Sequence, residues 1–298
     1  MCAVAENIRL IEEDQAQGRV HDIYYDIRRT MGTPLVGDIF RAFAAFPPFL
    51  EVVWWEIKPL IGGAVFEGLA DRLRAHALAC SRQHLYMPDH SKALAARGLD
   101  EAEVARIRDV VEVFYETDPR LLAIATIVHE SLTTGPVGAT VRRHTGYRAN
   151  PPLVAAPLKL ASPAAAPGQV RIVFDDVKLT LGLPVVPSAF RALARWPDYL
   201  QMAWEDVKGQ ARTAEFRRHV DEIRDIAVAG LRELPRPVRV DATTVRGAGV
   251  RQEQLSQVYE LADLLQSVQP KHVGVVTLLR LGLNSTLEEK LLELEAGA

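Results

Sequence analysis

The chain has 298 residues, of which 48% are hydrophobic and 24% are charged, and its formal net charge is −3. These values are typical of a globular protein with one large domain or two of ordinary size, and the even spread of charge argues against nucleic acid as a partner. The acidic N-terminus is unlike a signal peptide and no stretch reaches about 18 apolar residues, so we predict a cytoplasmic protein without a membrane partner.

The first predicted helix covers residues 19–27, where Val20, Ile23 and Ile27 recur at helical spacing. Its counterpart 150 residues later, QVRIVFDD at 169–176, resembles a strand in its β-branched content. Both segments lie within a longer stretch of sequence similarity between the two halves of the chain, so we predict a helix for both. In each copy a proline, Pro47 or Pro197, separates two further predicted helices.

That similarity is an internal repeat. Residues 18–58 align with residues 168–208, and roughly fifteen of about forty positions are identical, where chance would give two or three. The similarity resumes with a shift of one residue where Asp118-Pro119-Arg120 aligns with Gln269-Pro270-Lys271. We therefore predict two repeats of about 150 residues, at 1–146 and 168–298, joined by a Pro/Ala-rich linker at 147–167.

Asp100, followed by Glu103, predicts the capped start of another helix, whose apolar positions include Val104, Ile107 and Phe114. Strand-like alternation with hairpin turns is missing throughout the sequence, so the predicted fold class is all-α. Two similar units in one chain are expected to pack as an intramolecular pseudo-dimer about an approximate two-fold axis. A cleft near that axis would be lined by matching residues of both repeats and would be a favourable ligand site.

The metal and nucleophile motifs are weak. The chain has no CxxC pair, and Cys80 lies in an apolar helical segment where a buried thiol is the simplest interpretation. His84 and His90 are six residues apart, too far round a helix to share a face, and the His-Glu pair at 129–130 lacks the second histidine of HExxH. We predict no metal site and no cofactor.

Asp38 begins a predicted helix of the first repeat, and Ser188 has the same place in the second. Both residue types are common helix N-caps. If the two helix starts face each other, Asp38, Ser188 and free backbone N–H groups would surround one volume, which would suit a small carboxylate. Arg41 and Arg191, also equivalent, would either clamp such a carboxylate or form salt bridges between helices.

Over nearly its whole length the chain resembles the group I 2-haloacid dehalogenases, also called halocarboxylic acid dehydrogenases. The resemblance is carried by YYDIRRT at 24–30, FYETDP at 114–119, HESLTTGPVG at 129–138, PPLVAAPL at 151–158 and SAFRALARWPDYLQ at 188–201. It implies an all-helical pseudo-dimer that hydrolyses small halogenated acids without a cofactor. In that family an aspartate in a Ser-Asp-Phe motif activates the attacking water, whereas this chain has Ser188-Ala189-Phe190.

Other pocket positions implied by the resemblance also differ from the family. An asparagine falls on Tyr115, a tryptophan and a phenylalanine fall on Leu35 and Asp38, and a tyrosine falls on Leu265. We therefore expect a divergent hydrolase for a small organic acid, with Asp38 as a relocated base and Ser188 as an orienting donor. The alternative is a catalytically silent homologue that binds a small molecule. A homodimer is also compatible with the sequence.

A fainter resemblance links residues 90–104 to the alkylhydroperoxidase D-like proteins. In those proteins a CxxC pair precedes the histidine, and here its positions hold Gln83 and Tyr86. Thiol peroxidase chemistry requires a nucleophilic thiolate and a resolving cysteine. The resemblance therefore bears on the fold alone.

Overall fold

The computed structural model describes residues 8–139, 146 and 158–296, with the backbone alone for residues 284–296. Within these ranges the regular elements are helices, apart from one isolated bridge between Val137 and Val238. The prediction of an all-α fold is confirmed. In the same ranges, no helix combines the length and the apolar composition needed to cross a membrane.

Residues 8–134 form six α-helices and a short 3₁₀ helix. They are α1 (Gly18–Met31), α2 (Asp38–Phe43), α3 (Pro47–Ile57), η1 (Lys58–Leu60), α4 (Ala64–His84), α5 (His90–Ala96) and α6 (Glu101–Thr134). Residues 158–296 form six more α-helices with two 3₁₀ helices. They are η2 (Pro163–Ala165), α7 (Gly168–Leu181), α8 (Ser188–Leu193), α9 (Pro197–Ala211), α10 (Ala214–Gly230), η3 (Leu231–Glu233), α11 (Ala242–Gly247) and α12 (Gln252–Ala296).

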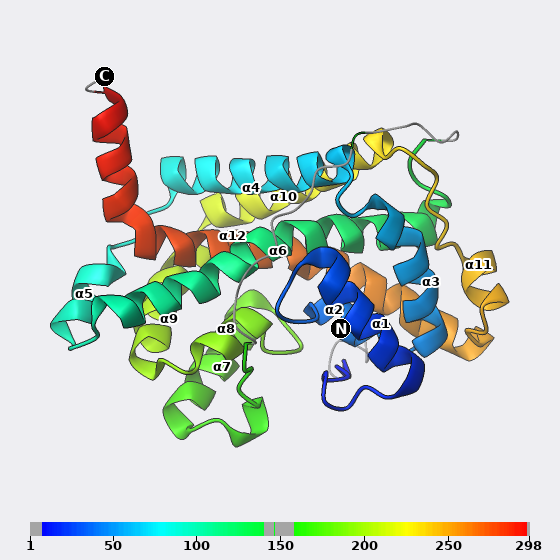
Figure 1. Cartoon of the computed structure of the whole chain (residues 1–298), viewed down its shortest axis with the longest axis horizontal. Coiled ribbons are helices and arrows are strands. Elements are labelled where there is room, and N and C mark those ends of the chain that lie inside the picture. Colours follow the sequence, from blue (N-terminus) through cyan, green and yellow to red (C-terminus); the bar gives the residue numbers. More distant parts are fainter. Residues whose placement is uncertain (1–7, 140–145, 147–157, 297–298) are drawn as a thin grey trace.

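The two longest helices, α6 and α12, pack against each other at the centre of the molecule. Figure 1 shows α4 and α10 side by side along one flank of this pair, whereas α1 to α3 and α7 to α9 lie below it in separate groups. Elements of the two halves also meet at the ends of the molecule, where α5 contacts α9 and α11 contacts α3. Long-range contacts between the halves therefore surround the central pair.

Local sequence explains several helix boundaries. α1 and α7 both end at a glycine in the left-handed region, Gly32 with φ 65° and Gly182 with φ 64°, which is the usual C-terminal stop. α3 and α9 both begin with proline, whose missing N–H has no partner at that position in any helix. Asp100 Oδ1 accepts from the Glu103 amide at 2.7 Å, so the predicted cap of α6 is confirmed.

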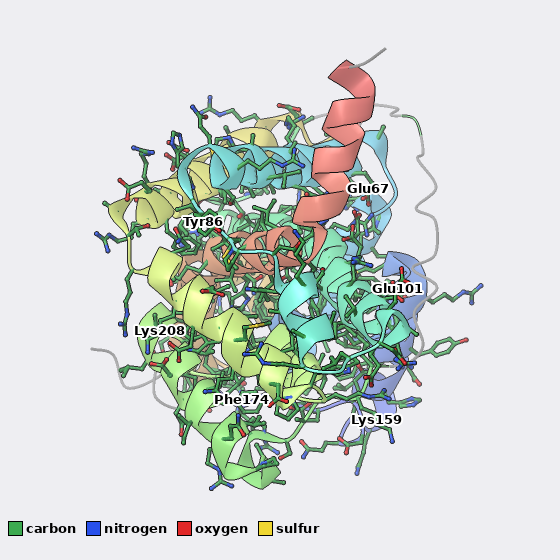
Figure 2. The ribbon with its side chains drawn as sticks, turned by 90° about the vertical axis from the view of Figure 1, so that its left-hand side faces the viewer. Glu67, Tyr86, Glu101, Lys159, Phe174 and Lys208 are labelled. Carbon is green, nitrogen blue, oxygen red and sulfur yellow. The ribbon has the colours of Figure 1, made fainter. Side chains whose placement is uncertain are left out.

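One set of polar contacts occurs in both halves. An aspartate on α1 or α7 accepts a hydrogen bond from a tryptophan indole and forms an ion pair with a lysine one turn further along. The two sets are Asp26, Trp54 and Lys58, and Asp176, Trp204 and Lys208. Figure 2 shows Lys208 on α9, beside α7, which carries the buried Phe174.

Candidate active site

A cavity lies at the centre of the molecule, between the starts of α2 and α8 and the middle parts of α6 and α12. Water-sized molecules can occupy about 20 Å³ of it. That occupied space exceeds the roughly 10–15 Å³ that one water needs. Both halves contribute to the lining, and several lining residues are equivalent in the sequence alignment. These pairs are Asp38 with Ser188, Asp118 with Gln269, and Leu121 with His272.

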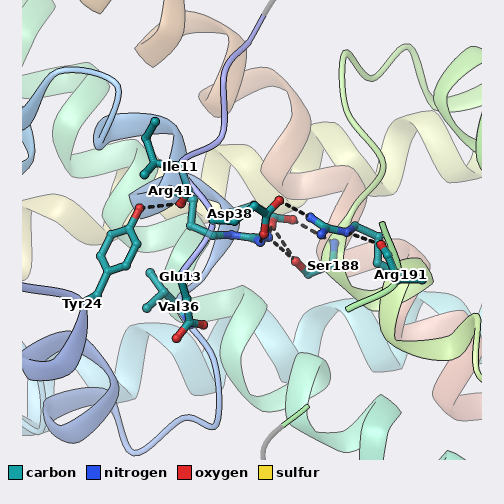
Figure 3. Close-up of polar contacts among 10 residues, drawn as sticks. Ile11, Glu13, Tyr24, Val36, Asp38, Arg41, Ser188 and Arg191 are labelled. Carbon is teal, nitrogen blue, oxygen red and sulfur yellow. Dashed lines mark hydrogen bonds and ion pairs between the residues drawn. The ribbon is translucent and has the colours of Figure 1, made fainter. Parts of the chain in front are cut away.

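Asp38 and Ser188 are in direct contact. The Ser188 amide donates to Asp38 Oδ2 at 3.0 Å, and the Ser188 hydroxyl donates to Asp38 Oδ1 at 2.6 Å. Arg41 Nη2 donates both to Asp38 Oδ1 and to the Ser188 hydroxyl (Figure 3). The first free amide of α8 is thus capped by a carboxylate from the other half of the chain.

These contacts fix the charge state of Asp38. Burial alone would raise the pKa of its carboxyl, but the Arg41 guanidinium and the hydrogen bonds from Ser188 outweigh burial and hold the pKa below its usual range. Asp38 is therefore an ionised carboxylate at neutral pH. Its side chain is 12% exposed, whereas that of Arg41 is 1% exposed. The ion pair is therefore well shielded from solvent.

The two equivalent arginines hold a carboxylate of the chain itself. Arg41 Nη1 lies 2.5 Å from Glu12 Oε2, and Arg191 Nη1 lies 2.7 Å from Glu12 Oε1. Arg191 also donates through Nε to the Ala161 carbonyl at 2.9 Å. Of the two roles considered from the sequence, salt bridges within the protein account for these contacts.

Two buried ionisable groups face Asp38 inside the cavity. Burial, together with the nearby charge of Asp38, raises the pKa of the Asp118 carboxyl well above its usual value. Burial lowers the pKa of His272 to about 4, although the charge of Asp38 opposes the shift. At neutral pH the imidazole of His272 is thus neutral, and Asp118 keeps its proton at pH values at which an exposed aspartate has lost it.

Three buried polar atoms of the lining have no hydrogen-bond partner within the described part of the chain. They are Thr117 Oγ1, Gln269 Oε1 and His272 Nε2. Buried polar groups in native proteins almost always have a partner, which can be a bound water or ligand. The cavity therefore presents polar atoms that can bind a water or a ligand.

Most residues selected from the sequence lie together at this cavity. Leu35, Ala189 and Phe190 line it with Asp38 and Ser188. Leu265 instead lines an adjoining cavity, whose walls also include Asp38, Gln269 and His272.

Tyr115 is not part of either lining. The guanidinium groups of Arg280 and Arg74 lie over its ring, 4.4 Å and 5.8 Å from the ring centroid.

The sequence reasoning missed the four polar lining residues on α6 and α12, namely Thr117, Asp118, Gln269 and His272. A usable signal was present, because Asp118-Pro119 aligns with Gln269-Pro270 between the halves. Each proline lies inside its helix and removes a backbone hydrogen bond one turn before it. Polar residues beside a proline, at aligned positions in the interior of two long helices, therefore indicate a site.

Comparison with known proteins agrees with this architecture. The halocarboxylic acid dehydrogenase DehI family matches residues 34–183. The chain is 29% identical over 262 residues to an (R)-2-haloacid dehalogenase of Pseudomonas putida, covering 87% of each chain.

Two solved structures share the fold at 26% identity and a TM-score of 0.90, and the alignments cover 95% of this chain. One is a D-2-haloacid dehalogenase mutant in complex with D-2-CPA, of which 97% is covered, and the other is a D-2-haloacid dehalogenase in complex with L-LA, of which 98% is covered. With a family match over half of its length and relatives similar along most of the rest, this chain belongs to the halocarboxylic acid dehydrogenase DehI family.

Proposed function

We propose that the chain is a divergent hydrolase that binds a small 2-substituted organic acid in the central cavity and acts without a cofactor. One observation carries the proposal: the ionised carboxylate of Asp38 meets Ser188 of the other half at a cavity that Ala189 also lines. By the family resemblance, position 189 is where the water-activating aspartate would stand. A methyl group accepts no proton, so Asp38 takes that role here.

The proposed step is a direct displacement. The oxygen of a water attacks the substituted α-carbon, the halide leaves with the electrons of the carbon–halogen bond, and Asp38 accepts the proton that the water loses. General-base assistance is worth roughly 10²–10⁴ in rate. The lowered pKa of Asp38 keeps it ionised but also makes it a weak base, so we expect slow turnover.

The polar atoms of the cavity support an acid as the ligand. A protonated Asp118 offers an O–H donor to a substrate carboxylate, and the adjacent Thr117 Oγ1 has no hydrogen-bond partner among the described residues. The amides of Ala189 and Phe190 follow Ser188 at the start of α8, where a helix has free N–H groups. Solved relatives in complex with D-2-CPA and L-LA point to the same ligand class.

We also propose that residues 1–146 and 168–298 are tandem repeats that pack as an intramolecular pseudo-dimer. The matching order of six helices in each half and the two Asp-Trp-Lys contacts support this arrangement. So does the lining of the cavity by equivalent residues. The segment 147–157 of the predicted linker lies outside the described residues.

The alternative is a silent homologue that binds a small acid without turnover. It is favoured by the way Asp38 is held, since Arg41 and Ser188 contact both of its oxygens. A carboxylate fixed in this way has less freedom to approach a water. In that case the cavity keeps its binding function and loses its chemistry.

Halide release from each enantiomer of 2-chloropropionate tests the proposal. We expect slow release by the wild type and a loss of roughly 10²-fold or more in Asp38→Asn, which keeps the size of the side chain. Glu51→Gln is the matched control, because Glu51 is an exposed carboxylate paired with Arg19 far from the cavity. Full activity in Asp38→Asn would contradict the role of Asp38, and calorimetric binding without any halide release would favour the silent homologue.

A further inference from the structure

A second cluster of reactive side chains lies away from the cavity, between α4 and α10. His76 and Cys80 are one turn apart on α4, and Glu222 faces them from α10. Cys80 Sγ lies 3.4 Å from His76 Nε2 and 3.7 Å from Glu222 Oε2, and His76 Nε2 lies 3.1 Å from the same oxygen. Cys80 is thus one member of a polar trio, whereas the sequence suggested a simple buried thiol.

These separations are those of a tetrahedral metal site. Zinc lies about 2.3 Å from cysteine sulfur and about 2.0–2.2 Å from histidine nitrogen or carboxylate oxygen, so tetrahedral neighbours are about 3.4–3.6 Å apart. Of the three observed distances, 3.4 Å falls within that range, 3.7 Å is 0.1 Å above it and 3.1 Å is 0.3 Å below it. A thiolate, an imidazole and a carboxylate are also the ligand types that zinc prefers.

Neighbouring side chains complete the surroundings. Glu222 Oε1 lies 3.8 Å from Arg218 Nε, whereas Glu222 Oε2 contacts His76 and Cys80. His219, on the same turn of α10, is 4% exposed, and neither of its ring nitrogens has a hydrogen-bond partner within the described ranges. The ring of His84, on α4, lies beside that of His219, with 5.4 Å between the ring centroids. Solvent can reach the trio, since the side chains of His76 and Glu222 are 29% and 41% exposed.

We propose that His76, Cys80 and Glu222 form a zinc site with three protein ligands and a water in the fourth position. On binding, the Cys80 thiol loses its proton to the solvent and its sulfur forms a bond to Zn²⁺, while the histidine and the carboxylate each supply a lone pair. Because the ligands come from α4 and α10, the ion joins helices of the two halves. The site is separate from the central cavity and does not depend on the function proposed for it.

Metal titration of the chelator-treated full-length protein tests this site. We expect one equivalent of Co²⁺ to produce the thiolate-to-cobalt absorption and the visible bands of a four-coordinate ion, and Zn²⁺ to displace it. Calorimetry with Zn²⁺ in buffers of different ionisation enthalpy should show the release of about one proton per ion at pH values below the pKa of the thiol. Zn²⁺ in excess should also raise the melting temperature, and the rise should grow with the logarithm of the Zn²⁺ concentration.

Substitutions identify the ligands. Cys80→Ser should abolish the thiolate absorption, and Cys80→Ser, His76→Ala and Glu222→Gln should each weaken Zn²⁺ binding by more than the roughly 10–100-fold typical of an outer-shell change. Cys2→Ser and His21→Ala, which remove the other cysteine and an exposed histidine, should bind as the wild type does. Circular dichroism verifies that each variant is folded. An absence of stoichiometric binding, or undiminished binding by folded Cys80→Ser, would overturn the proposal.

Discussion

Replacing Asp38 by asparagine should destabilise the protein markedly. The substitution removes one of the two carboxylates that compensate the guanidinium of Arg41, which is 1% exposed. Breaking a buried ion pair from one side typically costs about 3–5 kcal/mol, because the remaining charge stays buried. Asparagine still offers an oxygen to the Ser188 amide and Glu12 still contacts Arg41, so we expect the lower end, about 3 kcal/mol.

Thermal unfolding followed by circular dichroism at neutral pH measures the effect. A loss of about 3 kcal/mol corresponds to a fall in melting temperature of about 5 °C for a chain of this size. The matched comparison is Glu51→Gln, which breaks the Arg19–Glu51 pair, where the side chains are 57% and 38% exposed. Exposed ion pairs contribute about 0–1 kcal/mol, so this variant should melt close to the wild type.

The pH dependence provides a second test of the same reasoning. Asp38 has a lower pKa in the folded protein than in the unfolded chain, so its ionised form contributes stability above the unfolded pKa. That contribution is lost as the pH falls through the folded pKa, and the difference between wild type and Asp38→Asn should shrink there. Equal melting temperatures for Asp38→Asn and Glu51→Gln at neutral pH would refute the argument.

Three further predictions concern other parts of the molecule. Asp118→Asn should raise the melting temperature at pH 8 but not at pH 4. The pKa of Asp118 is raised in the folded protein, so the wild type loses stability as the pH rises above the unfolded pKa of about 3.9. Equal changes in melting temperature at both pH values would contradict this reasoning. Gly230→Ala should destabilise the protein by about 1–3 kcal/mol in urea unfolding, because a Cβ there would lie 2.4 Å from a leucine side chain of α4. Gly68→Ala is the control, because a Cβ there would meet nothing within 4 Å, and it should stabilise the protein by about 0.5–1 kcal/mol. Asp26→Asn and Asp176→Asn should each lower the free energy of unfolding by about 1 kcal/mol, because each removes the equivalent contacts with a tryptophan and a lysine. Clearly unequal losses of stability would count against equivalent halves.

Much of the fold could be predicted because residues 18–58 and 168–208 are similar in sequence. The segment 169–176 is β-branched and looks like a strand locally, yet it lies inside α7, as its partner in α1 indicated. The prolines at 47 and 197 begin α3 and α9, and Asp100 caps α6, because these residues act on the backbone beside them. Signals that operate within one turn of helix can be read without knowing the tertiary structure.

The site was only partly accessible from the sequence. The meeting of Asp38 and Ser188 could be anticipated from their equivalent positions, but the partner of Arg41 and Arg191 could not, because Glu12 lies in an irregular segment before α1. The trio at Cys80 was missed for a related reason. Its third member, Glu222, is 142 residues away on a different helix, and only the packing of α4 against α10 brings it near.

The single glutamate shared by two arginines makes the halves of the chain non-interchangeable. At the position equivalent to Glu12 the second half has Ser162, and at the position of Asp38 it has Ser188. A symmetric assembly made from two copies of the second half alone would bury a guanidinium on each side with neither carboxylate to neutralise it.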